Sequence, residues 1–109
     1  MLVLSCATAC GASPPPDPNT RYGAIQREEA ALERALAAEA SLGDEIAREG
    51  PRDARCDLAA QERNEAVQAA DRVCALARGA LGSDGTVRCE RARARAHEAS
   101  VHVSACDGR

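Results

Sequence analysis

Six cysteines and two histidines are the residues of this 109-residue chain whose types and spacing could support chemistry. Four of the cysteines lie in the second half, as an inner pair, Cys74 and Cys89, and an outer pair, Cys56 and Cys106. Both pairs are centred on the glycine-containing stretch 79–85. If two antiparallel helices fold back on each other there, the two cysteines of each pair lie opposite each other at the same height along the hairpin. Level cysteines are suited to forming disulfides across a helix pair.

Only one pairing of these four cysteines fits a helical hairpin, although four cysteines allow three pairings. Cys56 and Cys74 would lie on one helix, about 27 Å apart at 1.5 Å per residue. The Cα atoms of a disulfide lie about 4.4–6.8 Å apart, so this pairing fails, as does Cys89 with Cys106. Pairing Cys56 with Cys89 would need the helices to slip far out of register. The nested pairs Cys56–Cys106 and Cys74–Cys89 remain.

The positions between the cysteines are mostly small and follow the same mirror rule. Steps of three and four residues, as in a heptad seam, give the facing pairs Ala60 with Val103, Arg63 with Ala99, Val67 with Ala96, and Ala70 with Ala92. Small seam residues let two helix axes approach to about 8 Å, which brings facing Cα atoms within disulfide range. Arg63 is the exception, and we expect its charged head to reach solvent at the seam edge.

A third helix is predicted over residues 20–49, because this stretch has no proline and its large apolar residues fall largely on one face: Ile25, Leu32, Leu36, Leu42 and Ile46. Asn19 or Thr20 can cap its start, and Gly50-Pro51 ends it. Residues 20–50 hold seven acids and four arginines, whereas residues 86–106 hold four arginines and two acids. Opposite charges favour packing of this helix on the hairpin. Projection as an oligomerising coil is the alternative.

The predicted fold is all-α, an antiparallel hairpin of helices 53–78 and 86–106 stapled by two nested disulfides, with helix 20–49 packed on it or projecting. We expect Asp53 to cap the second helix, and Ser83, Asp84 or Thr86 to cap the third. The division expected along the chain is a signal-peptide end (1–9), a proline-rich tether (10–19) and one three-helix domain (20–109).

Composition explains why such a domain needs disulfides. Aromatic residues make up 1% of the chain, with no Trp or Phe, and many of the apolar residues are alanines. Burying an alanine methyl stabilises far less than the ~1.5–3 kcal/mol of a leucine or valine, so a core of this kind is marginal at this length. Six cysteines in a small domain also indicate an oxidising compartment.

The N-terminal sequence MLVLSCATAC, followed by Gly-Ala-Ser and a proline-rich stretch, resembles the end of a bacterial lipoprotein signal peptide. In that family the cysteine after the cleavage site is acylated. The resemblance assigns lipidation to Cys10, with Cys6 as the alternative; Cys10 leaves an even number of cysteines to pair. A basic segment before the apolar run is missing, so we expect the true start of translation to lie upstream.

By the same resemblance, a lipid anchor would attach the protein to the bacterial cell envelope. Gly11 follows Cys10 where an aspartate signals inner-membrane retention in the enteric lipoprotein family. The outer membrane, facing the periplasm, is therefore favoured over the inner membrane, with secretion as the alternative.

Three segments of the second half are similar to a group of small cysteine-rich helical proteins of myxobacteria: Cys56-Asp57-Leu58, Ala70 to Ala77 (ADRVCALA), and Arg88-Cys89-Glu90-Arg91-Ala92. That group carries R-[IV]-C-x-[IL]-A, then a short turn, then C-x-x-A. The resemblance covers roughly residues 56–106. It implies a helical fold and an envelope location but no activity.

Other chemistry has weaker support. His97 and His102 are five residues apart, about 140° around a helix, so one metal cannot readily use both. Arg88, Arg91 and Arg95 form a stripe that could touch phosphate, but the chain has a net charge of −3 and no lysine, so nucleic acid is not expected. No cofactor and no enzymatic activity are expected. The predicted role is structural or protein-interacting, with an unidentified envelope protein as partner. A periplasmic metal- or redox-active protein using Cys89, His97 and Cys106 is the alternative.

Overall fold

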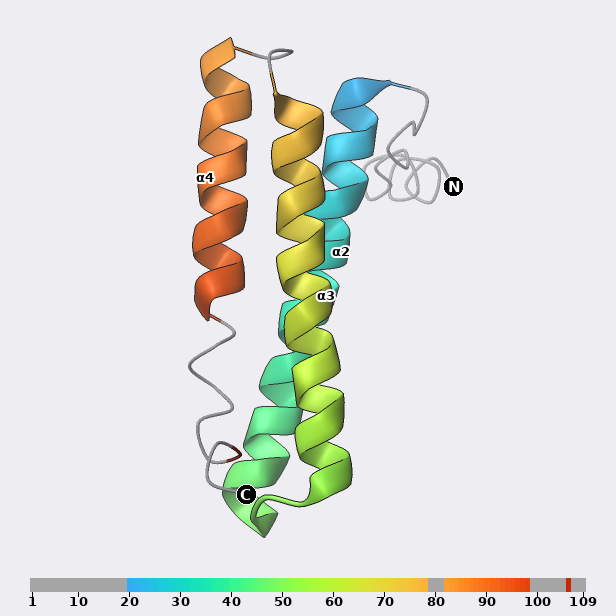
Figure 1. The fold of residues 1–109 in the computed structure, drawn as a ribbon, viewed down its shortest axis with the longest axis vertical. Coiled ribbons are helices and arrows are strands. Elements are labelled where there is room, and N and C mark those ends of the chain that lie inside the picture. Colours follow the sequence, from blue (N-terminus) through green and yellow to red (C-terminus); the bar gives the residue numbers. More distant parts are fainter. Residues whose placement is uncertain (1–19, 79–81, 99–105, 107–109) are drawn as a thin grey trace, which may run out of the picture.

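The computed structural model describes residues 20–78, 82–98 and 106. Within these residues there are three helices and no strand: α2 (Arg21–Glu49), α3 (Asp53–Ala77) and α4 (Gly82–Glu98). The helices run alternately down and up, with α3 between α4 and α2 in the view of Figure 1. The predicted all-α class is therefore confirmed.

Helix α2 begins and ends where the sequence predicts. The hydroxyl oxygen of Thr20 accepts a hydrogen bond of 2.9 Å from the backbone N–H of Gly23, which satisfies one of the free donors of the first turn. Gly50 ends the helix with a φ of +89°, a backbone conformation that favours glycine, and its N–H donates to the carbonyl of Ile46 at 2.8 Å. The poor helix formers Ser41 and Gly43 lie within this unbroken helix.

The start of α3 differs by one residue from the prediction. The N-cap is Arg52, which makes no capping bond with its side chain, and Asp53 is the first helical residue rather than the cap. Arg52 itself is extended, with a φ of −128° and a ψ of 147°, so the chain turns into α3 only after it. In the first turn, the carboxylate of Asp53 still opposes the positive end of the helix dipole.

Helix α4 begins at Gly82, four residues before the predicted start at 86. Gly82 has a φ of +55°, so a glycine turn starts the helix. Asp84, one of the predicted caps, lies instead in the first turn, where its charge opposes the dipole and pairs with Arg88. The helix is described as far as Glu98. Of the rest of the predicted helix 86–106, only Cys106 lies within the described residues.

The core joins α2 to α3 more closely than α3 to α4. Its main cluster takes Ile25, Leu32, Ala35 and Leu36 from α2, five residues from α3, and two alanines from α4. A second cluster contains Ile46, Cys56 and Ala59, with Leu42 and Cys106 packed against it. Helix 20–49 thus packs within the molecule. The sequence left this open.

Candidate functional site

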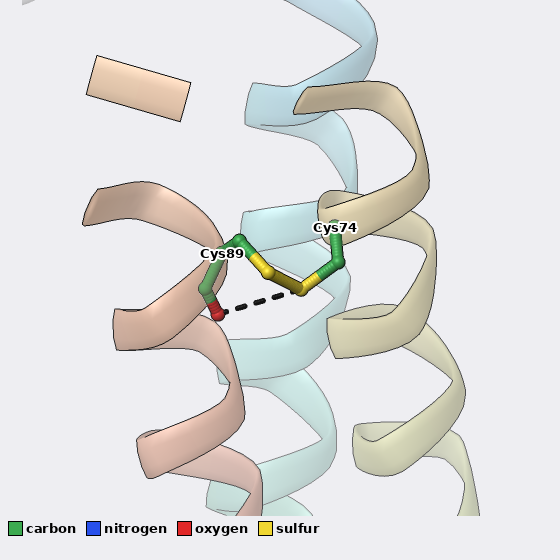
Figure 2. The surroundings of a disulfide bond; sticks show 2 residues. All are labelled: Cys74 and Cys89. Carbon is green, nitrogen blue, oxygen red and sulfur yellow. Dashed lines mark hydrogen bonds between the residues drawn. A yellow bond between two sulfur atoms is a disulfide. The ribbon is translucent and has the colours of Figure 1, made fainter. Parts of the chain in front are cut away.

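The inner disulfide, Cys74–Cys89, connects α3 to α4 near the turn between them (Figure 2). The two Cα atoms are 4.5 Å apart, at the short end of the disulfide range. The Sγ of Cys74 also lies 3.5 Å from the carbonyl oxygen of Cys89, the dashed line in the figure. A disulfide sulfur has no proton to donate, so we regard this as a close contact. The covalent bond fixes the register of α4 on α3.

The outer disulfide, Cys56–Cys106, has a Cα–Cα distance of 5.8 Å and closes a sequence separation of 50 residues. Cys56 is 2% exposed and packs with Ile46 and Ala59. The bond therefore attaches the C-terminal end of the chain to the end of the bundle where α2 turns into α3. Both disulfides join the cysteines that the mirror spacing predicts.

Arginines of α4 reach across to glutamates of α2. Arg95 contacts Glu33 through two hydrogen bonds, Nε to Oε2 at 3.0 Å and Nη2 to Oε1 at 2.5 Å, and its Nη1 donates to Glu98 Oε2 at 2.5 Å. Arg88 Nη1 donates to Glu29 Oε1 at 2.6 Å. Since α2 and α4 otherwise touch little, these ion pairs make up much of the contact between them.

Arg88 is the most enclosed of the paired arginines, with 16% of its side chain exposed. Besides Glu29 it contacts Asp84 at 3.0 Å, and its Nη2 donates to the hydroxyl of Tyr22. Its Cζ lies 4.6 Å from the centre of the Tyr22 ring, within cation–π range. The single aromatic residue of the chain thus helps to hold α4 against the start of α2.

The contacts shift the pKa values of these groups. The hydrogen bond from Arg95 lowers the pKa of Glu33, against a smaller upward effect of burial. The same bond is the largest cause that raises the pKa of Arg95. Burial acts to lower the pKa of Arg88, but Asp84, Glu29 and Tyr22 together raise it. Both arginines therefore remain charged at any physiological pH.

Two further arginines, both on α3, pair with α2. Arg72 Nε lies 2.5 Å from Glu28 Oε2, and Arg55 contacts both Glu45 and Glu49 near the end of α2. In each of these ion pairs between helices, the carboxylate lies on α2 and the arginine on α3 or α4.

The sequence analysis did not predict that one acidic residue is buried. Glu39 is 0% exposed and lies on the buried face of α2, seven residues from both Leu32 and Ile46. With Arg95 and Glu98 it lines a cleft of about 230 Å³ between α2 and α4. The seven-residue repeat Ile25, Leu32, Glu39, Ile46 was the available signal, since the first, second and fourth members were assigned to the buried face.

A cleft of about 620 Å³ lies along the α3–α4 pair. The inner disulfide forms part of its wall, together with Ala77, Gly85 and Arg93. A second cleft of about 290 Å³ continues along the same two helices and also includes Arg93. The predicted seam residues Arg63, Val67 and Ala96 line this second cleft.

The structure separates the residues of the predicted metal or redox site. Cys89 and Cys106 belong to different disulfides, so neither offers a thiolate while these bonds are intact. His97 is exposed on α4, and His102 lies outside the described residues. Among the residues that the structure describes, no three His, Cys, Asp or Glu side chains are grouped to hold a metal ion.

The three arginines of the predicted stripe on α4 do not share one environment. Arg88 and Arg95 turn to α2, as the charge pattern suggested, while Arg91 is exposed. The predicted lipidation sites Cys10 and Cys6 fall outside the described residues. Within the described ranges, no helix combines the length and apolar character needed to span a membrane.

Comparison with family models, with curated proteins and with solved structures finds no match to this chain.

Proposed function

We propose that the protein is a non-enzymatic lipoprotein of the bacterial cell envelope that presents a rigid helical surface to another protein. The observation that carries this proposal is the pair of nested disulfides, Cys56–Cys106 and Cys74–Cys89, which hold the ends of an alanine-rich bundle. Disulfides of this kind persist in oxidising compartments such as the periplasm. Stapling maintains the shape of a surface that a small core would hold only weakly.

The lipid anchor and the envelope address rest on the N-terminal pattern around Cys10, with Cys6 as the alternative, and on the resemblance to bacterial lipoproteins. The similarity of residues 56–106 to the myxobacterial group is in keeping with an envelope location. The outer membrane, on its periplasmic side, is the favoured address, and a secreted form is the alternative.

The test is the intact mass of the protein, measured without reduction after expression with its upstream targeting segment. We expect cleavage before Cys10, an added diacylglycerol and the mass deficit of two disulfides. The corresponding mass after reduction and alkylation counts the cysteines. An unlipidated chain that keeps its N-terminus would overturn the anchor, and a chain with no disulfide would overturn the stapled surface.

The metal- or redox-active alternative has one observation in its favour, the position of Cys74–Cys89 in the wall of the 620 Å³ cleft. It requires free thiols at Cys89 and Cys106. Titration of the folded mature protein with a thiol reagent separates the two proposals. The lipoprotein scaffold predicts no reactive thiol, whereas two or more support the alternative.

A further inference from the structure

The two clefts along α3 and α4 meet at Arg93, and we call them together the α3–α4 groove, defined by the residues lining both clefts. The larger part contains Cys74 and Cys89, the smaller part contains Val67 and Ala96, and both include Arg93. No α2 residue lines either part. The groove therefore lies on a side of the helix pair that α2 does not cover.

The floor of the α3–α4 groove consists mostly of small residues. Ala70, Cys74 and Ala77 come from α3, and Gly85 and Ala96 from α4. Small residues let another helix approach to about 8 Å between axes. Val67, also in this floor, is 45% exposed, which leaves one large aliphatic side chain available to a partner.

The edges of the groove carry three arginines. Arg63 and Arg78 lie on the α3 side and Arg93 on the α4 side, together with Asp71 and Glu90. None of these three arginines makes an ion pair with a described residue. The groove thus has a positive balance in a chain of net charge −3.

Helix α2 shows what kind of ligand the α3–α4 pair accepts on its other side. It contributes an apolar stripe that includes Ile25 and Leu32. Its glutamates accept hydrogen bonds from both neighbours: Glu28 from Arg72 of α3, and Glu29 and Glu33 from Arg88 and Arg95 of α4. An acidic amphipathic helix therefore satisfies arginines on both helices at once.

We infer that the α3–α4 groove binds an acidic amphipathic helix of another protein. This rests on the proposed interaction role and specifies the chemistry of its partner. The inner disulfide sets Cys74 level with Cys89, so Arg93, four residues further along α4, lies level with Ala70 of α3. Ala70 is eight residues from Arg78 and seven from Arg63. At 1.5 Å per residue the three arginine positions follow one another at intervals of about 10–12 Å.

An interval of 10–12 Å equals about seven residues of the partner helix. Arg63 and Arg78 lie on one edge of the groove and Arg93 on the other, so the partner is a helix with a stripe of aliphatic residues and carboxylates on both sides of that stripe. The stripe rests on the small residues of the floor, and carboxylates from the two sides, about seven residues apart along the helix, meet arginines on opposite edges. The partner helix therefore packs on the groove as α2 packs on the other side of the α3–α4 pair, with an apolar stripe in the middle and carboxylates that pair with arginines.

The probe for this binding is a fluorescein-labelled peptide of residues 20–50, which has seven acids, four arginines and a net charge of −3. It is titrated against the full chain with both disulfides formed, and binding is followed by fluorescence anisotropy. We expect saturable binding that weakens at least tenfold when Arg63 and Arg93 are both replaced by Ser, and that weakens as salt is raised. A peptide with Gln at positions 28, 29 and 33 should bind similarly weakly.

The matched control is Arg91→Ser, which removes an exposed α4 arginine that lines neither cleft; it should leave binding unchanged. Thermal unfolding and thiol counting check that each variant is folded and fully disulfide-bonded. Absence of saturable binding at millimolar concentration overturns the inference. Binding that is not affected by the Arg63 and Arg93 changes also overturns the inference, because the peptide then replaces the protein's own α2 instead of occupying the groove.

Sedimentation tests a second copy of the chain as the occupant. Self-association that is lost in the Arg63→Ser, Arg93→Ser double variant would assign the groove to another copy and overturn the partner named here. The mass measurement for the lipid anchor and the disulfides does not depend on these two arginines. A negative binding result would therefore leave the envelope proposal standing.

Discussion

Arg95 of α4 and Glu33 of α2 meet through two parallel hydrogen bonds, with both carboxylate oxygens engaged by one guanidinium. This fork-to-fork geometry is the strong form of an arginine–carboxylate pair. Together with the contacts of Arg88 to Glu29 and Tyr22, it connects two helices that otherwise touch little, and α4 is further attached to α3 by the Cys74–Cys89 bond. Helix α4 is thus attached to α3 by a covalent bond and to α2 by ion pairs.

The first prediction concerns the pH dependence of this pair. Because the folded-state pKa of Glu33 lies below its ordinary value, its stabilisation is complete above that ordinary value, about 4.3. It is lost as the pH falls through the lowered pKa of the folded state. Glu33→Gln should therefore lower the melting temperature at pH 7, and the difference from the parent should close as the pH falls through the lowered pKa of Glu33.

More than half of the Glu33 side chain is exposed, so we expect an effect of only about 0.2–1 kcal/mol at pH 7. The measurement is thermal unfolding of both proteins at a series of pH values in low salt. Glu65→Gln is the control, since Glu65 is exposed and makes no ion pair with a described residue. Parallel pH curves for Glu33→Gln and its parent would show that the pair does not stabilise the fold.

The second prediction concerns the inner disulfide. Replacing Cys74 and Cys89 together by Ala removes the closed loop without leaving a free thiol. We expect a protein that is still helical but less stable by about 2–4 kcal/mol, because a loop of about 15 residues contributes about 3 kcal/mol by the chain-entropy estimate. Urea unfolding followed by circular dichroism measures the loss.

Peptide mapping of the parent protein without reduction provides the control for this experiment. It should recover Cys74 linked to Cys89 and Cys56 linked to Cys106. A crossed link, or a double variant as stable as the parent, would contradict the role assigned to the bond.

The third prediction compares two alanines on α4. Ala92 is 3% exposed in the core, whereas Ala94 is exposed. Ala92→Leu should overpack the contact with α3 and cost about 1–3 kcal/mol. Ala94→Leu should cost little, because its side chain points to solvent. Chemical denaturation of both variants decides the register; equal losses would show that the predicted seam is wrong.

The disulfide pairing could be predicted because helix geometry leaves few choices. Cys56 and Cys74 lie too far apart along one helix, and only the nested pairs keep the same register. The seam was predicted well at Ala70, Ala92 and Ala96, all of which are buried. Val67 proved 45% exposed, because the α3–α4 seam opens there into the groove.

The packing partner of helix 20–49 could not be predicted with the same certainty. An apolar stripe shows that a face is buried but not against which helix, and the charge pattern gave only a preference. The α2–α3 contact became the larger one because the largest aliphatic residues of the core, Ile25, Leu32 and Leu36, lie on α2. The burial of Glu39 was not predicted, because acidic residues were expected to be exposed whatever their position on the helix.

The last prediction concerns the anchor, which lies outside the described residues. In the protein expressed with its targeting segment, Cys10→Ala should move the chain from the membrane to the soluble periplasmic fraction. A single acyl chain binds membranes only marginally, but two or more hold firmly, because each buried CH₂ adds about 0.8 kcal/mol. Fractionation followed by immunoblotting is the measurement.

Cys6→Ala is the matched control for the anchor, since it removes the other N-terminal cysteine and should leave the protein on the membrane. Release by Cys6→Ala instead would make Cys6 the acylated residue. If neither variant is released, the membrane association does not depend on an acylated cysteine and the lipoprotein assignment is wrong. With Cys10 removed, Cys56, Cys74, Cys89 and Cys106 should still form both disulfides, because the helices that carry Cys56, Cys74 and Cys89 do not include the anchor.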